Sequence, residues 1–265
     1  MKKVLGFLIL ILVCICMLVS YRMYNYYALP QLQEPYLING QNHDDTLRIA
    51  YIGDSWANYH QEHKCIIEQI LEDSLHQPVR VYSYGICGLT SKEIYENMFR
   101  NNEFKNFFQQ HKFSYCFISA GINDTYKKMS TSYYRKSMDG IIQLLLANHI
   151  HPIIMEIPDY YIQKAYEWQT PDKKILRRLS MIINGTPLDC KQLFRNALDE
   201  LIQEKGYSDK VTIVRYKTWN NDYSNDLKTF YVKDGMHLNE KGYTKLDSVI
   251  ANSIISPTDT PLHNQ

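Results

Sequence analysis

The hydrophobic positions form one unbroken apolar run near the N-terminus and, from residue 47 onward, a series of short runs. Residues 4–20 contain no charged residue and no proline, with two lysines before them and an arginine at position 22. As a helix this run spans roughly 25 Å, slightly less than a hydrocarbon core. It is typical of a signal peptide or a signal anchor. We favour an uncleaved anchor over residues 1–22, because Leu18 fits poorly at a small-x-small cleavage site.

The flanking charges predict which side of the membrane the rest of the chain occupies. Two lysines before the run against one arginine after it place the N-terminus in the cytoplasm. We interpret residues 23–46, polar and aromatic without a clear period, as a tether to a domain over 47–256, and residues 257–265 as a flexible tail. The expected protein is single-pass in the cytoplasmic membrane of a bacterium. Its domain lies in the periplasm or at the cell surface, and is secreted if the N-terminal segment is cleaved.

From residue 47, short apolar strands alternate with amphipathic helices. This alternation predicts a three-layer α/β/α domain around a five-stranded parallel sheet. The segment 158–189 breaks the rhythm directly after a strand, where open α/β sheets place their ligands, so we expect an insertion near the site. The predicted strands are 47–52, 79–84, 113–119, 152–157 and 210–216, and the predicted helices are 56–74, 91–100, 133–149, 190–206 and 240–255.

Composition and charge exclude some classes of function. The chain is 45% hydrophobic and 22% charged, which is ordinary for a globular protein. With 29 basic and 28 acidic residues the net charge is +1, so we expect no nucleic-acid partner. The 22 tyrosines are unusually many. Four cysteines outside the apolar run have no zinc-ligand spacing, and their disulfide state stays open: Cys65, Cys87, Cys116 and Cys190.

Polar or glycine positions follow four of the predicted strands. Ser55 comes after the first, Gly88 after the second and Asn123 after the third, and Asp234 and His237 follow the fifth. Singly, each has an ordinary explanation as a helix cap, a turn residue or a surface pair. Parallel strands end at one edge of a sheet, so together these loops supply a nucleophile, two oxyanion donors and an acid–base pair.

The four blocks resemble those of the SGNH hydrolases, also called the GDSL esterase/lipase family. The resemblance covers about residues 47–255 and implies a flavodoxin-like fold without a cofactor or metal. It implies that Ser55 is the nucleophile, His237 the base and Asp234 the residue that orients the base. The Ser55 and Gly88 N–H groups and the Asn123 amide would form the oxyanion hole. Activity should then fall once the imidazole is protonated, because imidazolium cannot accept a proton.

Two points within the resemblance need a choice. Gly85 competes with Gly88 as the glycine donor, and we prefer Gly88 because the Thr-Ser after it matches the family pattern. Trp56 stands where the commonest motif has leucine, and we expect this ring to shape the acyl pocket.

Aromatic residues are frequent in the loops expected to border the site. Aromatic rings suit the faces of sugars, so together with the resemblance we expect an extracytoplasmic serine esterase acting on short acyl esters, mainly O-acetyl groups of a carbohydrate or cell-envelope glycan. An O-acyltransferase, a lipase or lysophospholipase, and a non-catalytic glycan-binding module stay open, as does the oligomeric state. The candidate substrate-binding residues are Trp56, Tyr160, Trp168 and Trp219, with Tyr161 and Tyr223 nearby.

Two other assignments are excluded by the residues themselves. The chain lacks the Gly-x-Ser-x-Gly string of α/β-hydrolases. His60, His63 and Cys65 do not follow one another at a common helical spacing, so we expect no metal there.

Overall fold

The computed structural model describes residues 2–41 and 44–256, and the expected flexible tail 257–265 lies outside the described residues. Five parallel strands form one sheet in the order β2-β1-β3-β4-β5. This confirms the predicted five-stranded parallel sheet, and the strand order is that of flavodoxin-like folds, whose ligand crevice lies between β1 and β3. The strands are β1 (Leu47–Gly53), β2 (Val79–Gly85), β3 (Tyr115–Ser119), β4 (His151–Met155) and β5 (Thr212–Val214).

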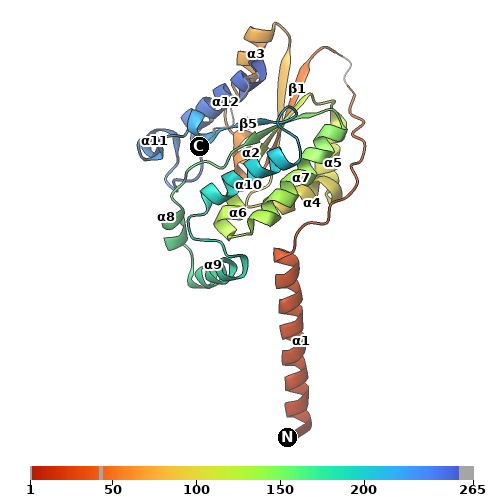
Figure 1. The fold of residues 1–265 in the computed structure, drawn as a ribbon, viewed down its shortest axis with the longest axis vertical. Coiled ribbons are helices and arrows are strands. Elements are labelled where there is room, and N and C mark those ends of the chain that lie inside the picture. The colour runs from red at the N-terminus through yellow and green to blue at the C-terminus, as the bar shows by residue number, and fades with distance from the viewer. Residues whose placement is uncertain (1, 42–43, 257–265) are drawn as a thin grey trace.

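Helices cover both faces of the sheet, so the domain has the predicted three layers (Figure 1). One face carries α2 (Ser55–His60), α3 (Ile67–Leu75) and α12 (Glu240–Ile255). The other carries α4 (Ser91–Arg100), α5 (Asn102–Gln110), α7 (Thr131–Ala147) and α10 (Lys191–Glu204). The remaining helices are α6 (Ile122–Lys127), α8 (Ile162–Glu167), α9 (Pro171–Asn184), the 3-10 turn Tyr216–Thr218 and α11 (Tyr223–Phe230).

The single helix predicted over 56–74 is wrong, because the chain breaks between α2 and α3. The buried carboxylate of Asp247 on α12 explains the break. One of its oxygens bonds His60 Nε2 at the end of α2, at 3.0 Å, and the other accepts the Ile66 N–H before α3, at 3.1 Å. One side chain from a distant helix therefore fixes both helix ends, which local periodicity could not indicate.

Much of the tyrosine excess is used in packing. Large aromatic side chains fill the interior, where dispersion and burial of apolar surface stabilise the fold. Ordinary packing therefore explains many of the tyrosines better than a sugar-binding rim does. The buried tyrosines are Tyr51, Tyr95, Tyr133, Tyr134, Tyr160, Tyr207, Tyr231 and Tyr243.

The N-terminal helix α1 (Lys2–Tyr27) projects from the domain (Figure 1). Its stretch Gly6–Tyr27 is long and apolar enough to cross a membrane and is not buried by the domain. Such a helix fits a signal anchor or a signal peptide. The following residues lie against the domain: the Gln33 N–H donates to Tyr95 and the Ile38 N–H to Asn148, each at 2.7 Å.

The buried His60–Asp247 contact predicts a large stability effect. Asp247→Ala leaves two donors, His60 Nε2 and the Ile66 N–H, without their acceptor. We expect the free energy of unfolding to fall by about 2–6 kcal/mol, from about 1–3 kcal/mol per orphaned donor. Chemical unfolding of the full chain in a mild detergent measures this. Glu200→Ala, which breaks an exposed pair with Arg135, is the control and should cost no more than about 1 kcal/mol.

Candidate active site

Three side chains from distant parts of the sequence form a continuous hydrogen-bonded chain at the carboxyl edge of the sheet. Ser55 Oγ lies 2.9 Å from His237 Nε2, and His237 Nδ1 lies 2.6 Å from Asp234 Oδ2. With the imidazole proton on Nδ1, donated to the carboxylate, Nε2 is free to accept from the serine hydroxyl. The arrangement can therefore take a proton from Ser55 as its oxygen attacks a carbonyl carbon.

The carboxylate of Asp234 is ionised over the whole physiological range. Partial burial raises its pKa, but the bonds from the His237 ring and from the His237 and Met236 N–H groups outweigh burial and lower the pKa to about 2. These backbone bonds, at 3.0 and 2.8 Å, close the turn that carries both triad candidates. The three-residue spacing of Asp234 and His237 in the sequence therefore corresponds to this turn.

Ser55 is the first residue of α2, immediately after β1. Asp54, not Ser55, caps this helix: Asp54 Oδ1 accepts the Trp56 N–H at 3.0 Å. The first turn of a helix leaves its N–H groups without intrahelical partners, so the Ser55 N–H is available beside its own hydroxyl. Ser55 is therefore not the N-cap of this helix.

Asp54 also holds Asn123 in place. Its fully buried carboxylate accepts from Asn123 Nδ2 and from Ser119 Oγ, both at 3.1 Å. Burial raises the pKa of Asp54 to about 6, although the bonds from Trp56, Ser119 and Asn123 oppose the rise. One amide hydrogen of Asn123 is thereby committed to Asp54, and the other is left for a ligand.

The structure separates the two glycine candidates. Gly88 borders the cavity at Ser55 and has φ +80°, and a Cβ there would have open space around it. Gly85 instead packs against α2, where a Cβ would lie 2.2 Å from the Asn58 nitrogen. Gly88 can therefore present its N–H to a ligand, whereas Gly85 is a close-approach position between β2 and α2.

The serine opens into a cavity of about 390 Å³. All five expected catalytic and oxyanion-hole residues border it. Several other residues that line the cavity are not predicted by the sequence pattern. Tyr59 stacks edge-on against the His237 ring at 5.1 Å between centroids, and its helical position next to Ser55 was the available signal. The others include Cys87, Ile122, Tyr126, Gln169, Lys173 and Met236.

Of the four aromatic residues expected to bind substrate, only Trp168 lines this cavity, and it is 60% exposed. Trp56 and Trp219 are buried and pack edge-on against each other, 5.8 Å apart, so they cannot contact a substrate directly. Tyr160 is also buried, and its hydroxyl bonds Thr125 Oγ1 at 2.7 Å. These three expectations are corrected: Trp56 on α2, and Tyr160 and Trp219 in loops, all turn into the core.

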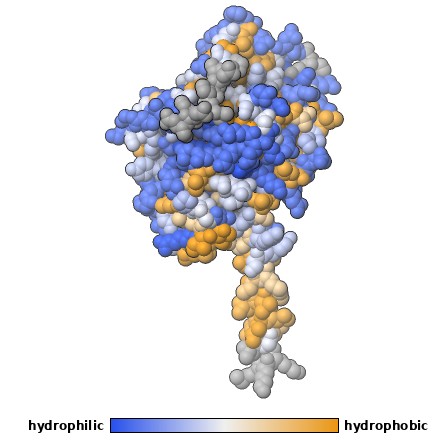
Figure 2. All heavy atoms as spheres, viewed as in Figure 1, coloured by the Kyte–Doolittle hydropathy of each residue, from blue (hydrophilic) through white to orange (hydrophobic). Residues whose placement is uncertain are grey.

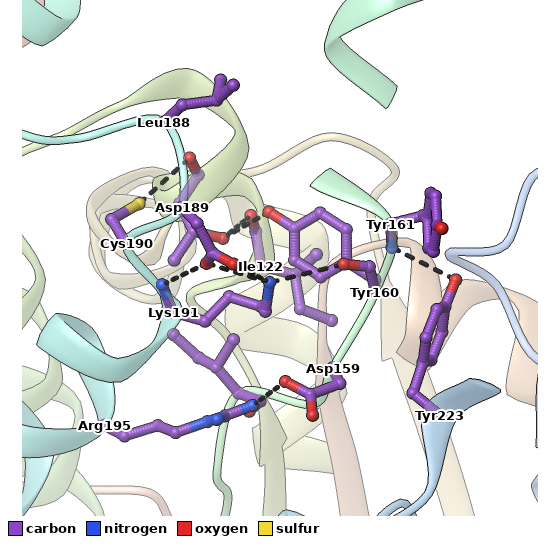
Figure 3. A network of polar contacts seen from close by, with 12 residues as sticks. Ile122, Asp159, Tyr160, Tyr161, Leu188, Asp189, Cys190, Lys191, Arg195 and Tyr223 are labelled. Carbon is purple, nitrogen blue, oxygen red and sulfur yellow. Dashed lines mark hydrogen bonds and ion pairs between the residues drawn. The ribbon is translucent and has the colours of Figure 1, made fainter. Parts of the chain in front are cut away.

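The start of the 158–189 insertion is anchored by a polar network (Figure 3). Arg195 on α10 donates to the Ile157 carbonyl at 2.8 Å and to Asp159 at 2.7 Å. The Tyr161 N–H donates to the Tyr223 hydroxyl at 3.1 Å. The insertion is therefore fixed at its base while α8 and α9 extend from the domain beside the cavity (Figure 1).

Within residues 2–41 and 44–256, one other group of side chains has potential metal ligands. His60, Cys65 and Asp247 lie within 4.8 Å of one another, although His63, which the sequence grouped with them, stacks on Tyr243. Both ring nitrogens of His60 are engaged, with Ser83 and with Asp247. This cluster works as a structural contact between α2 and α12. Cys65, Cys87, Cys116 and Cys190 are all free thiols, and Cys116 and Cys190 are buried.

Comparison with known proteins agrees with this architecture. The model of the GDSL-like lipase/acylhydrolase family matches residues 51–245. No curated protein matches the chain in sequence.

Solved structures share the fold at low sequence identity. A candidate SGNH hydrolase from Slackia heliotrinireducens is 14% identical with a TM-score of 0.52, covering 79% of this chain and 100% of that one. A lipase/acylhydrolase from Enterococcus faecalis is 13% identical with a TM-score of 0.54, covering 79% and 95%. A variant of the acetyl-xylooligosaccharide esterase Axe2 from Geobacillus is 14% identical with a TM-score of 0.52, covering 82% and 97%.

The family match spans most of the domain, and the fold is that of SGNH hydrolases. The chain therefore belongs to the GDSL-like lipase/acylhydrolase family and is a serine ester hydrolase.

Proposed function

We propose that the protein hydrolyses short acyl esters, mainly O-acetyl groups on a carbohydrate or cell-envelope glycan, with Ser55, His237 and Asp234 as its catalytic triad. The observation that carries the triad is the unbroken hydrogen-bonded chain from Ser55 Oγ to the Asp234 carboxylate.

In this mechanism Ser55 Oγ attacks the ester carbonyl while His237 Nε2 takes its proton. The negative charge on the carbonyl oxygen is met by the Ser55 and Gly88 N–H groups and by the Asn123 amide. One such donor contributes roughly 2.7–4 kcal/mol in the transition state. His237 then gives the proton to the leaving alcohol oxygen as the C–O bond breaks. Water, deprotonated by the same ring, releases the acid from Ser55.

The chemistry of the cavity wall supports a short acyl group on a polar alcohol. The rim combines aromatic rings with amide, hydroxyl and ammonium groups, beside the apolar side chains of Ile122, Ala165 and Met236; it includes Tyr126, Trp168, Gln169, Thr170 and Lys173. Aromatic rings bind the apolar faces of sugars, and the polar groups suit hydroxyls. The Geobacillus structural neighbour acts on acetylated xylo-oligosaccharides, which motivates testing acetylated sugars first.

An O-acyltransferase is the main alternative, because the same triad works when a sugar hydroxyl replaces water. Incubating the full chain with an activated acetyl ester and an oligosaccharide separates the two. Free acetate as the main product supports the hydrolase, and acetylated sugar as the main product rejects it.

Ser55→Ala should reduce hydrolysis of nitrophenyl acetate by roughly 10⁴–10⁶-fold, since the nucleophile is lost. Steady-state rates on the full chain in detergent measure this. Ser114→Ala, an exposed serine before β3, is the matched control and should keep wild-type activity. Retained turnover in Ser55→Ala would reject the triad and favour a non-catalytic role for the site.

Asp54→Asn should lower kcat by up to roughly 10²-fold, the cost of one misplaced oxyanion donor. Because the pKa of Asp54 is raised to about 6, its carboxylate is ionised above pH 6 and becomes protonated as the pH falls. The ratio of wild-type to variant kcat should therefore be largest above pH 6 and shrink below it.

A buried carboxylate outside the site provides the control for this pH effect. Asp124 also has a pKa raised to about 6 by burial, but it bonds Ser91. Asp124→Asn should not reproduce the pH-dependent ratio. Combining Asp54→Asn with Asn123→Ala should cost no more than Asn123→Ala alone, and additive losses would show that Asp54 does not act through Asn123.

Trp168→Ala should raise KM for acetylated oligosaccharides several-fold and leave nitrophenyl acetate turnover unchanged, because the exposed ring borders the cavity but belongs to neither the triad nor the expected oxyanion hole. A panel of acetylated glycans and esters of rising chain length measures both. Trp219→Ala is unsuitable as a control, since it empties the core, so Tyr161→Ala, an exposed aromatic outside the cavity, is used. Faster turnover of long-chain esters than of acetyl sugars would favour a lipase.

A further inference from the structure

Helix α9 is amphipathic, but its apolar side faces away from the domain. Two of its polar side chains point inward: Ser180 is fully buried, and Asn184 Nδ2 donates to the Lys128 carbonyl at 2.7 Å. Its large apolar side chains are exposed to solvent. They repeat at helical spacing and make one outward stripe: Ile175, Leu176, Leu179, Ile182 and Ile183, between 43% and 79% exposed. A surface helix of a globular domain normally turns such a stripe toward the core.

Helix α9 lies beside the end of α1. The Tyr27 hydroxyl, at the last residue of α1 and of its apolar stretch, bonds Ser180 Oγ on α9. Lys92 Nζ holds the same end of α1 by donating to the Asn25 and Ala28 carbonyls, each at 2.8 Å. Figure 1 draws α9 at the end of the domain from which α1 leaves, and Figure 2 shows apolar surface gathered there. If α1 crosses a membrane, α9 is at the level of the membrane surface.

The charges of α9 suit an anionic surface. The helix carries four basic residues and one acidic residue, Asp172. Basic amphipathic helices lie in the plane of a bilayer with their apolar side chains among the upper acyl chains and their cations near anionic headgroups. Contact with an anionic lipid surface would remove the apolar stripe from water and bring the neighbouring basic side chains close to the headgroups.

The catalytic cavity opens next to the same helix. Lys173 in the first turn of α9 and Thr170 before it line the cavity with Ser55, as does the exposed ring of Trp168. A bilayer in contact with α9 would thus lie close to the mouth of the cavity.

We propose that α9 is an in-plane membrane helix, seated in the outer leaflet of the bilayer that α1 spans, and that it holds the cavity at the membrane surface. The occupant of the apolar stripe is the lipid bilayer. Resting on the proposed function, the substrate is then an acyl ester carried by a membrane-embedded molecule, such as an acetylated sugar on a lipid tail.

Tryptophan fluorescence tests where α9 lies. The full chain is placed in vesicles of phosphatidylcholine and phosphatidylglycerol, with or without bromine on the acyl chains, because bromine quenches nearby indoles. Ile182→Trp should lose more emission in brominated vesicles than wild type does. Leu75→Trp is the matched control: it is an exposed leucine on α3, which Figure 1 draws at the opposite end of the domain, and it should add no lipid-quenched emission.

Two results would overturn the position of α9. If lipid does not quench Ile182→Trp but acrylamide in the water does, the stripe faces solvent. If neither quenches it, another protein surface, such as a second copy of this chain, covers the stripe.

Activity tests the substrate class. Wild type should hydrolyse an acetylated long-chain alkyl glucoside in vesicles faster than Ile182→Asp by roughly tenfold, since an apolar side chain is lost from the contact. Both proteins should hydrolyse acetylated methyl glucoside, which is soluble, at equal rates, and Leu75→Asp should match wild type on both. Equal rates of wild type and Ile182→Asp in vesicles would overturn the substrate class. Hydrolysis of neither sugar ester overturns the proposed function instead, while the fluorescence result still decides the position of α9.

Discussion

The buried carboxylate of Asp54 joins the parts of the site that come from separate strands. It caps α2, which starts with Ser55, and it bonds Ser119 at the end of β3 and Asn123 on α6. Burying a carboxylate costs free energy unless hydrogen bonds compensate its charge. Burial raises the pKa of Asp54 to about 6, although its hydrogen bonds oppose the rise. The crevice between β1 and β3 is the point where this group can reach both strands.

The polar interior also connects the site to the outer parts of the molecule. Arg195 and the network around it fix the base of the insertion, and Lys92 and Ser180 fix the end of α1 against α4 and α9. Hydrogen bonds thus attach both the insertion and the N-terminal helix to the domain that contains the cavity. In our proposal these contacts hold the cavity at the membrane surface, so that membrane-embedded esters reach Ser55.

Sequence patterns predicted best where one local period decides the structure. The five strands could be predicted because each is a short apolar run that ends at a turn, and the loops that carry the candidate triad follow from where those runs end. The same reasoning failed for α2 and α3, because the break depends on Asp247, which is distant in sequence. It also failed for Trp56 on α2 and Trp219 in a loop, since each ring is covered by the other from a distant part of the chain.

The sequence by itself determined the parallel sheet, the family and the residues that meet at its carboxyl edge, because parallel strands all end at the same edge. Only the tertiary structure decided that Gly88 rather than Gly85 borders the cavity, that Asp54 orients Asn123, and that the apolar stripe of α9 turns outward. The physical reason is that a hydrophobic pattern tells which side of an element is apolar. What covers that side is decided by packing between residues far apart along the chain.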